Sequence, residues 1–115
     1  MTDCLFCKIV DKQIKADIVH EDERALAFRD IRPAAPTHVL VIPRQHITSI
    51  DEIGSEHEAD VGYLLRIASQ IAAREGLTGG YRTVFNCGPD AGQSVFHIHL
   101  HVLGGRAMGW PPFPR

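Results

Sequence analysis

The sequence predicts an α+β domain: a five-stranded antiparallel sheet with one long helix and a short N-terminal helix. Three observations support this prediction: short segments of strand-forming residues, connections too brief for parallel crossovers, and one long amphipathic stretch in the middle of the chain. A length of 115 residues is typical of one domain, so residues 1–115 are expected to form a single unit.

The expected elements follow one another without a linker. A short helix is expected over residues 4–10, with Asp3 as its N-cap. Ser55 and Glu58 have the spacing of a capping box for the long helix, and Gly76 supplies its stop. The long helix is expected over residues 56–75, and strands over residues 18–20, 25–29, 37–42, 81–86 and 95–103.

The composition argues against several classes of protein. The formal net charge is -2 and there is no run of Lys and Arg, so neither nucleic acid nor an anionic membrane is an expected partner. No apolar run approaches the roughly 20 residues of a transmembrane helix, and no signal-peptide pattern opens the sequence. An odd number of cysteines, 3, argues against a disulfide framework, and a reducing, cytoplasmic compartment is expected.

Three histidines, His97, His99 and His101, stand at alternate positions of the last expected strand. Alternate side chains of a strand share one face, so the imidazoles are expected side by side. Such a row suits either a metal ion or a phosphate group. Phosphate is favoured because glycines and neutral hydrogen-bond donors come directly before it, namely Asn86, Gly88, Gly92, Gln93 and Ser94. A metal site built from the triad itself is the alternative.

This segment resembles the histidine-triad signature, in which three histidines alternate with apolar residues. The similarity covers nearly the whole chain and points to the nucleoside-phosphoramidase branch of that family; it includes residues 28–31, 35–43, 86 and 92–112. The resemblance implies one histidine-triad domain that forms a homodimer and hydrolyses purine nucleoside 5′-phosphoramidates, such as adenylated amines, to the nucleoside monophosphate. The alternatives are a dinucleoside polyphosphate hydrolase and a nucleotide-binding interaction module with little turnover.

The resemblance also implies roles for single residues. His99 is the expected nucleophile, which forms a covalent nucleotidyl-histidine that water then hydrolyses. His101 is expected to donate to a phosphate oxygen and to help the leaving group, Ser94 to pass it a proton, and His38 to support the triad through a hydrogen bond. Asp30 corresponds to the ligand of the ribose hydroxyls. The phosphate cradle is expected from Asn86, Gln93 and Ser94, and the walls around the purine from Leu5, Phe6, Ile9, Phe28 and Ile31.

A second site is expected around the Cys4-x-x-Cys7 pair, which is typical of metal-binding or redox proteins. Redox chemistry is the weaker interpretation, because no strand precedes the pair. Together with His46 and His97, the pair offers two thiolates and two imidazoles, a common zinc set, and the resemblance implies a structural zinc there. Two half-buried thiols without metal are the alternative, and no cofactor is expected for catalysis.

Overall fold

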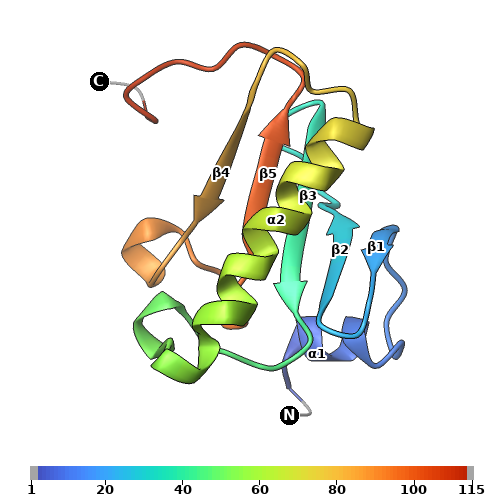
Figure 1. The fold of residues 1–115 in the computed structure, drawn as a ribbon. Helices are drawn as coiled ribbons and strands as arrows, with labels where there is room; N and C mark the ends of the chain where they lie inside the picture. The colour runs from blue at the N-terminus through green and yellow to red at the C-terminus, as the bar shows by residue number, and fades with distance from the viewer. Residues whose placement is uncertain (1–2, 114–115) are drawn as a thin grey trace.

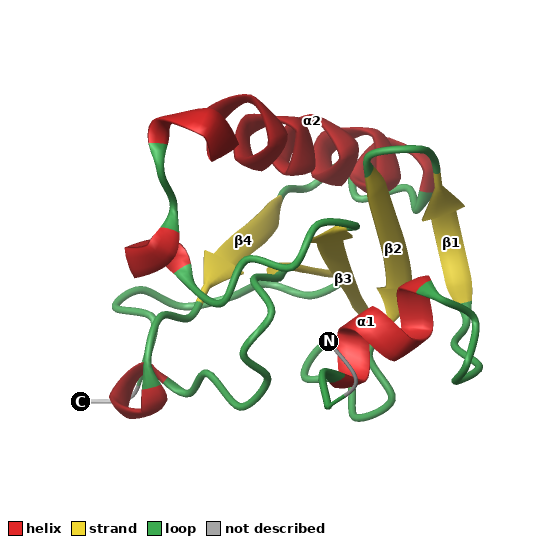
Figure 2. Ribbon diagram, turned by 90° about the horizontal axis from the view of Figure 1, so that it is seen from below, coloured by secondary structure: helices red, strands yellow, loops and turns green. Residues whose placement is uncertain are grey.

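The computed structural model, which describes residues 3–113, confirms the predicted five-stranded antiparallel sheet with its two helices (Figure 1). Helix α2 lies across one face of the sheet, and α1 lies on the opposite side (Figure 2). The described part of the chain also contains three short 3₁₀ turns. The elements are α1 (Leu5–Val10), β1 (Ile18–Glu21), β2 (Ala25–Arg29), β3 (Thr37–Pro43), α2 (Glu58–Arg74), β4 (Tyr81–Phe85) and β5 (Leu100–Gly104).

The strand order in the sheet is β1-β2-β3-β5-β4, and each neighbouring pair is antiparallel. Strand β3 occupies the centre, which explains why its sequence is apolar on both faces rather than alternating. Its pairing with β5 places Leu40 opposite His101 and His38 opposite Leu103. The register between these two strands therefore brings histidines from distant parts of the chain to one face.

Two apolar cores hold the sheet between its helices. The larger core packs the buried stripe of α2 onto β2, β3 and β5, and includes Leu64, Ile71 and Leu100. The smaller core packs α1 onto the other face of β2 and β3 through Phe6 and Ile9. The three histidines of the triad, His97, His99 and His101, lie on the α1 side of the sheet. Within residues 3–113, no helix combines the length and the apolar character needed to cross a membrane.

The cap of α1 differs from the prediction. The N-cap is Cys4 and not Asp3, and its Sγ accepts the N–H of Cys7 at 3.3 Å. The prediction was wrong because a thiol was not considered as a capping group, although sulfur can accept a hydrogen bond weakly. The first turn of the helix thus brings the two cysteine side chains together.

The start of α2 also differs from the prediction. The helix begins at Glu58, after a 3₁₀ turn over Ser55–His57, and the expected capping box of Ser55 with Glu58 is wrong. Instead, Gly54 N–H donates to His57 Nδ1 and His57 N–H donates to the Gly54 carbonyl, both at 2.9 Å. The two bonds are reciprocal, as in a capping box. Here the imidazole of His57 takes the place of the Glu or Gln side chain, and the Gly54 carbonyl takes the place of the N-cap side chain.

The largest correction concerns the last strand, which was predicted over residues 95–103 and is observed only over Leu100–Gly104. The segment before it makes other bonds. His97 donates its ring Nε2–H to the Pro43 carbonyl at 2.8 Å, and Ile98 N–H donates to the Ile47 carbonyl at 2.7 Å. The Pro43 carbonyl at the end of β3 is thus bonded to an imidazole, and the N–H of Ile98 is bonded to a loop carbonyl rather than to a neighbouring strand. Only His101 of the three histidines lies within the strand itself.

Candidate active site and metal centre

The ring of His99 is held by the backbone just before it. Its Nδ1 lies 2.8 Å from the carbonyl oxygen of His97, and Phe6 packs edge-on against it with ring centroids 5.1 Å apart. A carbonyl only accepts, so Nδ1 must carry the proton of the neutral ring, and Nε2 is left with its lone pair. The side chain is only 7% exposed. One nitrogen of His99 is therefore fixed as an unprotonated, nucleophilic atom.

The proton position on His101 is set by a relay that starts at the backbone. Ala34 N–H donates to His38 Nδ1 at 2.9 Å, which leaves the proton of neutral His38 on Nε2. That nitrogen lies 2.8 Å from His101 Nδ1, which must accept. The remaining nitrogen of His101, Nε2, therefore carries a proton. The rings of His99 and His101 have centroids 5.0 Å apart. The ring that carries a free lone pair, His99, therefore lies beside the ring that can donate a hydrogen bond, His101.

Burial keeps these rings neutral. Desolvation lowers the pKa of His99, although its bond to the His97 carbonyl and the charge of Asp30 act in the opposite direction. The pKa of His101 falls to about 4, mainly through desolvation and then through the neighbouring His99 and His38. Desolvation also lowers the pKa of His38. At neutral pH the set is therefore uncharged, as a nucleophilic imidazole requires.

Asp30 stands at one end of this row. Its Oδ2 lies 3.5 Å from His38 Nε2, while its Oδ1 accepts the N–H of Arg32 at 2.8 Å and closes a turn. Asp30, His38 and His101 offer ligand atoms within 4.8 Å of one another. Sequence periodicity does not reveal this cluster, because it brings together residues from a loop, β3 and β5. Asp30 thus closes a turn with one carboxylate oxygen and keeps the other near His38, a geometry compatible with its expected role as a polar ligand.

The loop before the triad is shaped by a buried amide. Gln93 is 4% exposed; it donates to the carbonyls of Thr48 and Val95 at 2.9 and 3.1 Å and accepts the N–H of Gly88 at 2.9 Å. Both N–H groups of its side chain thus already have partners, and the side chain shapes the loop. Asn86 uses one N–H on the Ala91 carbonyl at 2.8 Å and keeps a second.

The expected purine walls fall into two groups. Phe6, Ile9 and Phe28 belong to the buried core under α1, where Phe6 and Phe28 pack edge to face with centroids 5.3 Å apart. Leu5 is 45% exposed and Ile31 is 92% exposed. The first group is ordinary core that also borders His99, whereas the second is open to a ligand or to solvent. Ile31 is the most exposed of the five expected wall residues.

Two cysteines and two histidines meet at the other end of the row. Cys4 Sγ lies 3.4 Å from His97 Nδ1, and Cys7 Sγ lies 3.4 Å from His46 Nδ1 and 3.5 Å from His97 Nδ1. A tetrahedral zinc ion with bonds of about 2.3 Å to sulfur and about 2.0 Å to nitrogen separates such atoms by roughly 3.5 Å. The four ligand atoms lie within 4.8 Å of one another. The residues therefore fit zinc in type, number and spacing.

The protonation states also suit a metal ion. The bond from His97 Nε2–H to the Pro43 carbonyl leaves the lone pair of His97 on Nδ1, the nitrogen that faces the sulfurs. Desolvation lowers the pKa of His97 to about 4, so the ring is neutral. Without a cation, desolvation and the adjacent Cys4 raise the pKa of Cys7 to about 11. A divalent cation would reverse this effect and stabilise both thiolates.

Comparison with known proteins places this geometry in a family. The sequence pattern of the HIT domain matches residues 11–108. The chain belongs to the HIT domain family. An uncharacterised HIT-like protein of Synechococcus elongatus is 56% identical over 110 residues, 96% of each chain. A 14 kDa zinc-binding protein of Zea mays is 51% identical over 110 residues, which cover 94% of this chain and 86% of the maize protein.

Solved structures agree with this membership. The crystal structure of a HIT family hydrolase from Legionella pneumophila has a TM-score of 0.94 at 51% identity, and the match covers 96% of this chain and 100% of that one. A histidine triad nucleotide-binding protein from Candida albicans has a TM-score of 0.81 at 28% identity, over 98% of this chain and 86% of that one. The resemblance to the histidine-triad family is thus confirmed, and the HIT fold of this chain matches solved relatives.

The structure adds contacts that sequence reasoning missed. The Ala34 N–H sets the tautomer of His38, and the Pro43 carbonyl sets that of His97. Neither residue carries a polar side chain, so no motif signals its part. Thr48 is a further example, since its carbonyl anchors Gln93. Ala34 lies only four residues before His38, whereas the Pro43 and Thr48 carbonyls reach His97 and Gln93 because segments far apart in the sequence pack together.

Proposed function

We propose that this protein is a nucleotide hydrolase that cleaves purine nucleoside 5′-phosphoramidates to the nucleoside monophosphate and an amine. The observation that supports this most directly is the fixed pair of nitrogens, the lone pair of His99 Nε2 beside the N–H of His101 Nε2. A nucleophile next to a donor is what the displacement of a group from phosphorus requires. The names of the Legionella hydrolase and the Candida nucleotide-binding protein support the same reaction class.

The proposed reaction has two displacements at the α-phosphorus. In the first, His99 Nε2 forms a P–N bond while the bond from phosphorus to the substrate amine breaks, and the amine leaves with a proton passed through the Ser94 hydroxyl. In the second, the oxygen of a water molecule bonds to phosphorus, the bond from phosphorus to His99 breaks, and the water gives a proton back to the Ser94 hydroxyl, which supplied one in the first displacement. His101 Nε2–H donates to a phosphate oxygen throughout.

The other residues expected at the site take binding roles in this proposal. Asp30 accepts from the ribose hydroxyls, since its carboxylate borders His38. Asn86 offers its second N–H to the phosphate, and Gln93 acts through the shape of its loop. Leu5, Phe6, Ile9, Phe28 and Ile31 form the apolar surface for the base. Such contacts discriminate between bases only modestly.

The test is a trapped intermediate. Rapid acid-free denaturation during turnover of adenosine 5′-phosphoramidate, followed by mass spectrometry, is expected to show an adenylylated peptide that contains His99. The variant His99→Ala is expected to lose turnover and the adduct but to keep AMP binding by calorimetry. Substantial turnover by His99→Ala would refute the assignment. Binding of AMP without any turnover by the unaltered protein would favour an interaction module instead, and faster cleavage of dinucleoside polyphosphates would favour the anhydride hydrolase.

We propose that zinc occupies the Cys4, Cys7, His46 and His97 cluster and holds α1 to the sheet. The spacing of the four ligand atoms supports this, as does the name of the maize relative. The ion would supply a structural cross-link between the N-terminal turn and the segment before β5. Metal analysis is expected to give about one zinc per chain, and a metal-free preparation with unchanged thermal stability would contradict the proposal.

We propose further that two chains form a dimer in the cytoplasm. Strand β4 is an edge of the sheet, and Tyr81 on it is 42% exposed, while Leu65 on α2 is 48% exposed. An isologous pair would cover both. The three free thiols suit a reducing compartment. Analytical ultracentrifugation tests the dimer, and a monomer at working concentration would contradict it.

A further inference from the structure

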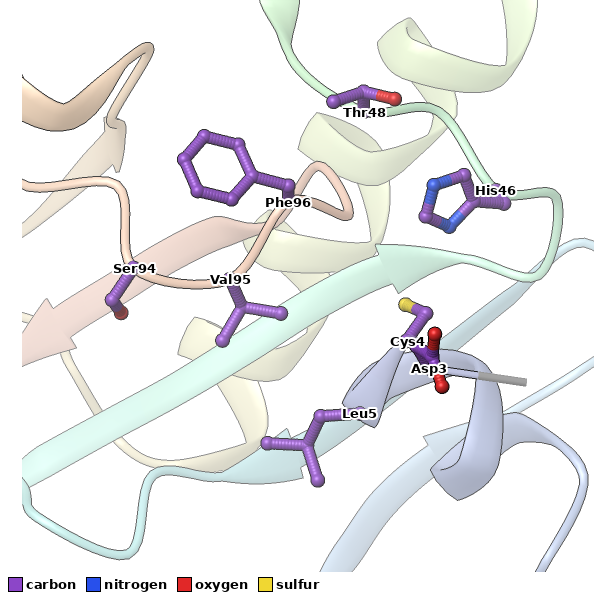
Figure 3. Close-up of a pocket in the computed structure, with 8 residues that line it drawn as sticks. All are labelled: Asp3, Cys4, Leu5, His46, Thr48, Ser94, Val95 and Phe96. Atoms are coloured by element: carbon purple, nitrogen blue, oxygen red, sulfur yellow. The ribbon is translucent and has the colours of Figure 1, made fainter. Parts of the chain in front are cut away.

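A pocket of about 520 Å³ opens beside the metal cluster, and among the residues that line it only Leu5 and Ser94 have a role toward the substrate in the function proposed so far (Figure 3). Residues 3–5 form one side and residues 94–96 the other, with His46 and Thr48 closing a third. The volume lies within the range of roughly 300–1,000 Å³ that small-molecule sites have. The pocket is therefore large enough for an organic group and not only for water.

The walls of the pocket are held in place. Buried Gln93 ties the Thr48 carbonyl to the Val95 carbonyl, and Ile98 N–H donates to the Ile47 carbonyl at 2.7 Å. The segments around residues 46–48 and 94–98 are thus joined at two points. A cavity whose walls are bonded to each other binds without the cost of ordering loops.

The position of the pocket indicates which part of a substrate reaches it. The polar groups form a row, from Asp30 through His38 and His101 to His99, and then through His97 to the cysteines. Ribose is assigned to the Asp30 end, and phosphate to the middle. The pocket lies at the opposite end, where Cys4 and His46 line it. A group bonded to the far side of the phosphate would extend toward it.

Ser94 connects the pocket to the reaction. This exposed residue lines the pocket and is also the proposed proton donor to the leaving group. The apolar part of the lining comes from Leu5, Val95 and Phe96, and Phe96 is 46% exposed. Asp3 contributes the one carboxylate among the described residues that line the cavity. The surface thus suits an apolar chain or ring that carries a cation.

We propose that this pocket binds the amine part of the phosphoramidate and selects amines with an aromatic or alkyl chain and a terminal positive charge. The proposal rests on the proposed phosphoramidase function. The bond that breaks is still the P–N bond to this amine, which takes up its proton through Ser94 and is released from the pocket. Phe96 and Thr48 are specificity residues here, and neither takes part in the bond changes.

The test compares adenosine phosphoramidates that differ only in the amine: ammonia, hexylamine, phenethylamine and 1,5-diaminopentane. Phe96→Ala is expected to lower kcat/KM for the phenethylamine derivative about tenfold and for the ammonia derivative less than about twofold. The pocket-filling variant Thr48→Phe is expected to slow the three large amines and to leave ammonia unchanged. Asp3→Asn is expected to reduce the preference for diaminopentane over hexylamine about threefold at low salt.

Ile14→Ala and Asp51→Asn are the matched controls, since both residues lie outside the pocket, and their selectivity is expected to equal that of the unaltered protein. An equal loss for all four substrates in Phe96→Ala would mean that the pocket holds the nucleotide, and it would overturn the proposal. So would unchanged selectivity in both Phe96→Ala and Thr48→Phe.

A second experiment tests the pocket separately from the proposed phosphoramidase activity. If the unaltered protein cleaves none of the four compounds, calorimetry measures their binding in competition with AMP. The phenethylamine derivative is then expected to bind more tightly than AMP by a margin that Phe96→Ala removes. Equal affinity for AMP and the phenethylamine derivative would overturn the pocket assignment independently of turnover.

Discussion

The relay from Ala34 through His38 to His101 can be cut at either of its two bonds by isosteric substitution. The amide of Asn can place an acceptor where His38 has Nδ1, so His38→Asn is able to keep the bond from Ala34 N–H but loses the bond to His101. The longer His38→Gln can place an N–H near the position of Nε2 and keep the bond to His101. The two variants remove opposite halves of one relay.

The expected effect on activity follows from the lost bond. The His38 to His101 hydrogen bond is 2.8 Å long and His38 is 7% exposed. A net hydrogen bond contributes about 1 kcal/mol, and an acceptor left without a partner costs about 1–3 kcal/mol. Because His101 then no longer favours the tautomer with its proton on Nε2, His38→Asn should lower kcat/KM by about 5- to 150-fold.

The assay is kcat/KM for an adenosine phosphoramidate, together with ¹⁵N chemical shifts of the histidine rings, which report the tautomer directly. The expected result is a mixed tautomer of His101 in His38→Asn and a retained Nε2–H tautomer in His38→Gln, with the larger loss of activity in the former. If His38→Asn were as active as the unaltered protein, or if both variants were equally impaired, the relay would not be what orients His101.

Three further predictions follow from other groups. Burial lowers the pKa of His99, and it lowers the pKa of His101 to about 4, so the acid limb of kcat/KM is expected below pH 6.5. The free energy of unfolding should fall as pH drops from 6.5, because the unfolded chain then binds more protons than the folded chain. An acid limb above pH 6.5 would contradict this prediction. If zinc occupies the cluster as proposed, Cys7→Ser should lower the zinc content, the Tm and the turnover, as measured by metal analysis, calorimetry and the phosphoramidate assay. Arg29→Met breaks a two-bond contact with Glu75 at 3.0 and 2.9 Å, and should lower the free energy of unfolding by about 1 kcal/mol in urea titration while kcat stays unchanged.

The sequence predicted most of the fold because local patterns and packing agree in most elements. Strands β1 to β4 begin and end within one residue of their expected bounds, and α2 follows the three- to four-residue spacing of its buried stripe. The segment at residues 95–99 was mispredicted as strand. Its alternation is that of a strand, but the Pro43 carbonyl lies 54 residues away and is bonded to the ring of His97. A pattern within one segment of the sequence cannot predict a contact between residues so far apart.

The site was predicted in its members but not in its connections. The alternating spacing predicted the row with His99 and His101, and the resemblance to the histidine-triad family supplied His38 and the set of Cys4, Cys7, His46 and His97, whose ligand atoms the structure brings together. The tautomers depend on backbone groups, and on the register that sets Leu40 opposite His101. Register is a property of paired strands, which a single segment does not contain. The pocket beside residues 94–96 was missed for the same reason, since its walls come from three separate segments.

His97 joins the two sites. Its carbonyl accepts a hydrogen bond from His99 Nδ1–H, and its ring Nδ1 faces Cys4 and Cys7. Its ring Nε2–H donates a hydrogen bond to the Pro43 carbonyl. Any ion in the cluster therefore holds the residue whose backbone orients the proposed nucleophile. A metal described as structural would thus affect the reaction through geometry, with no bond to substrate. If the metal acts in this way, its removal is expected to change both the ¹⁵N chemical shifts that report the tautomer of His99 and the thermal stability. A change in stability alone would mean that the ion only holds α1 to the sheet.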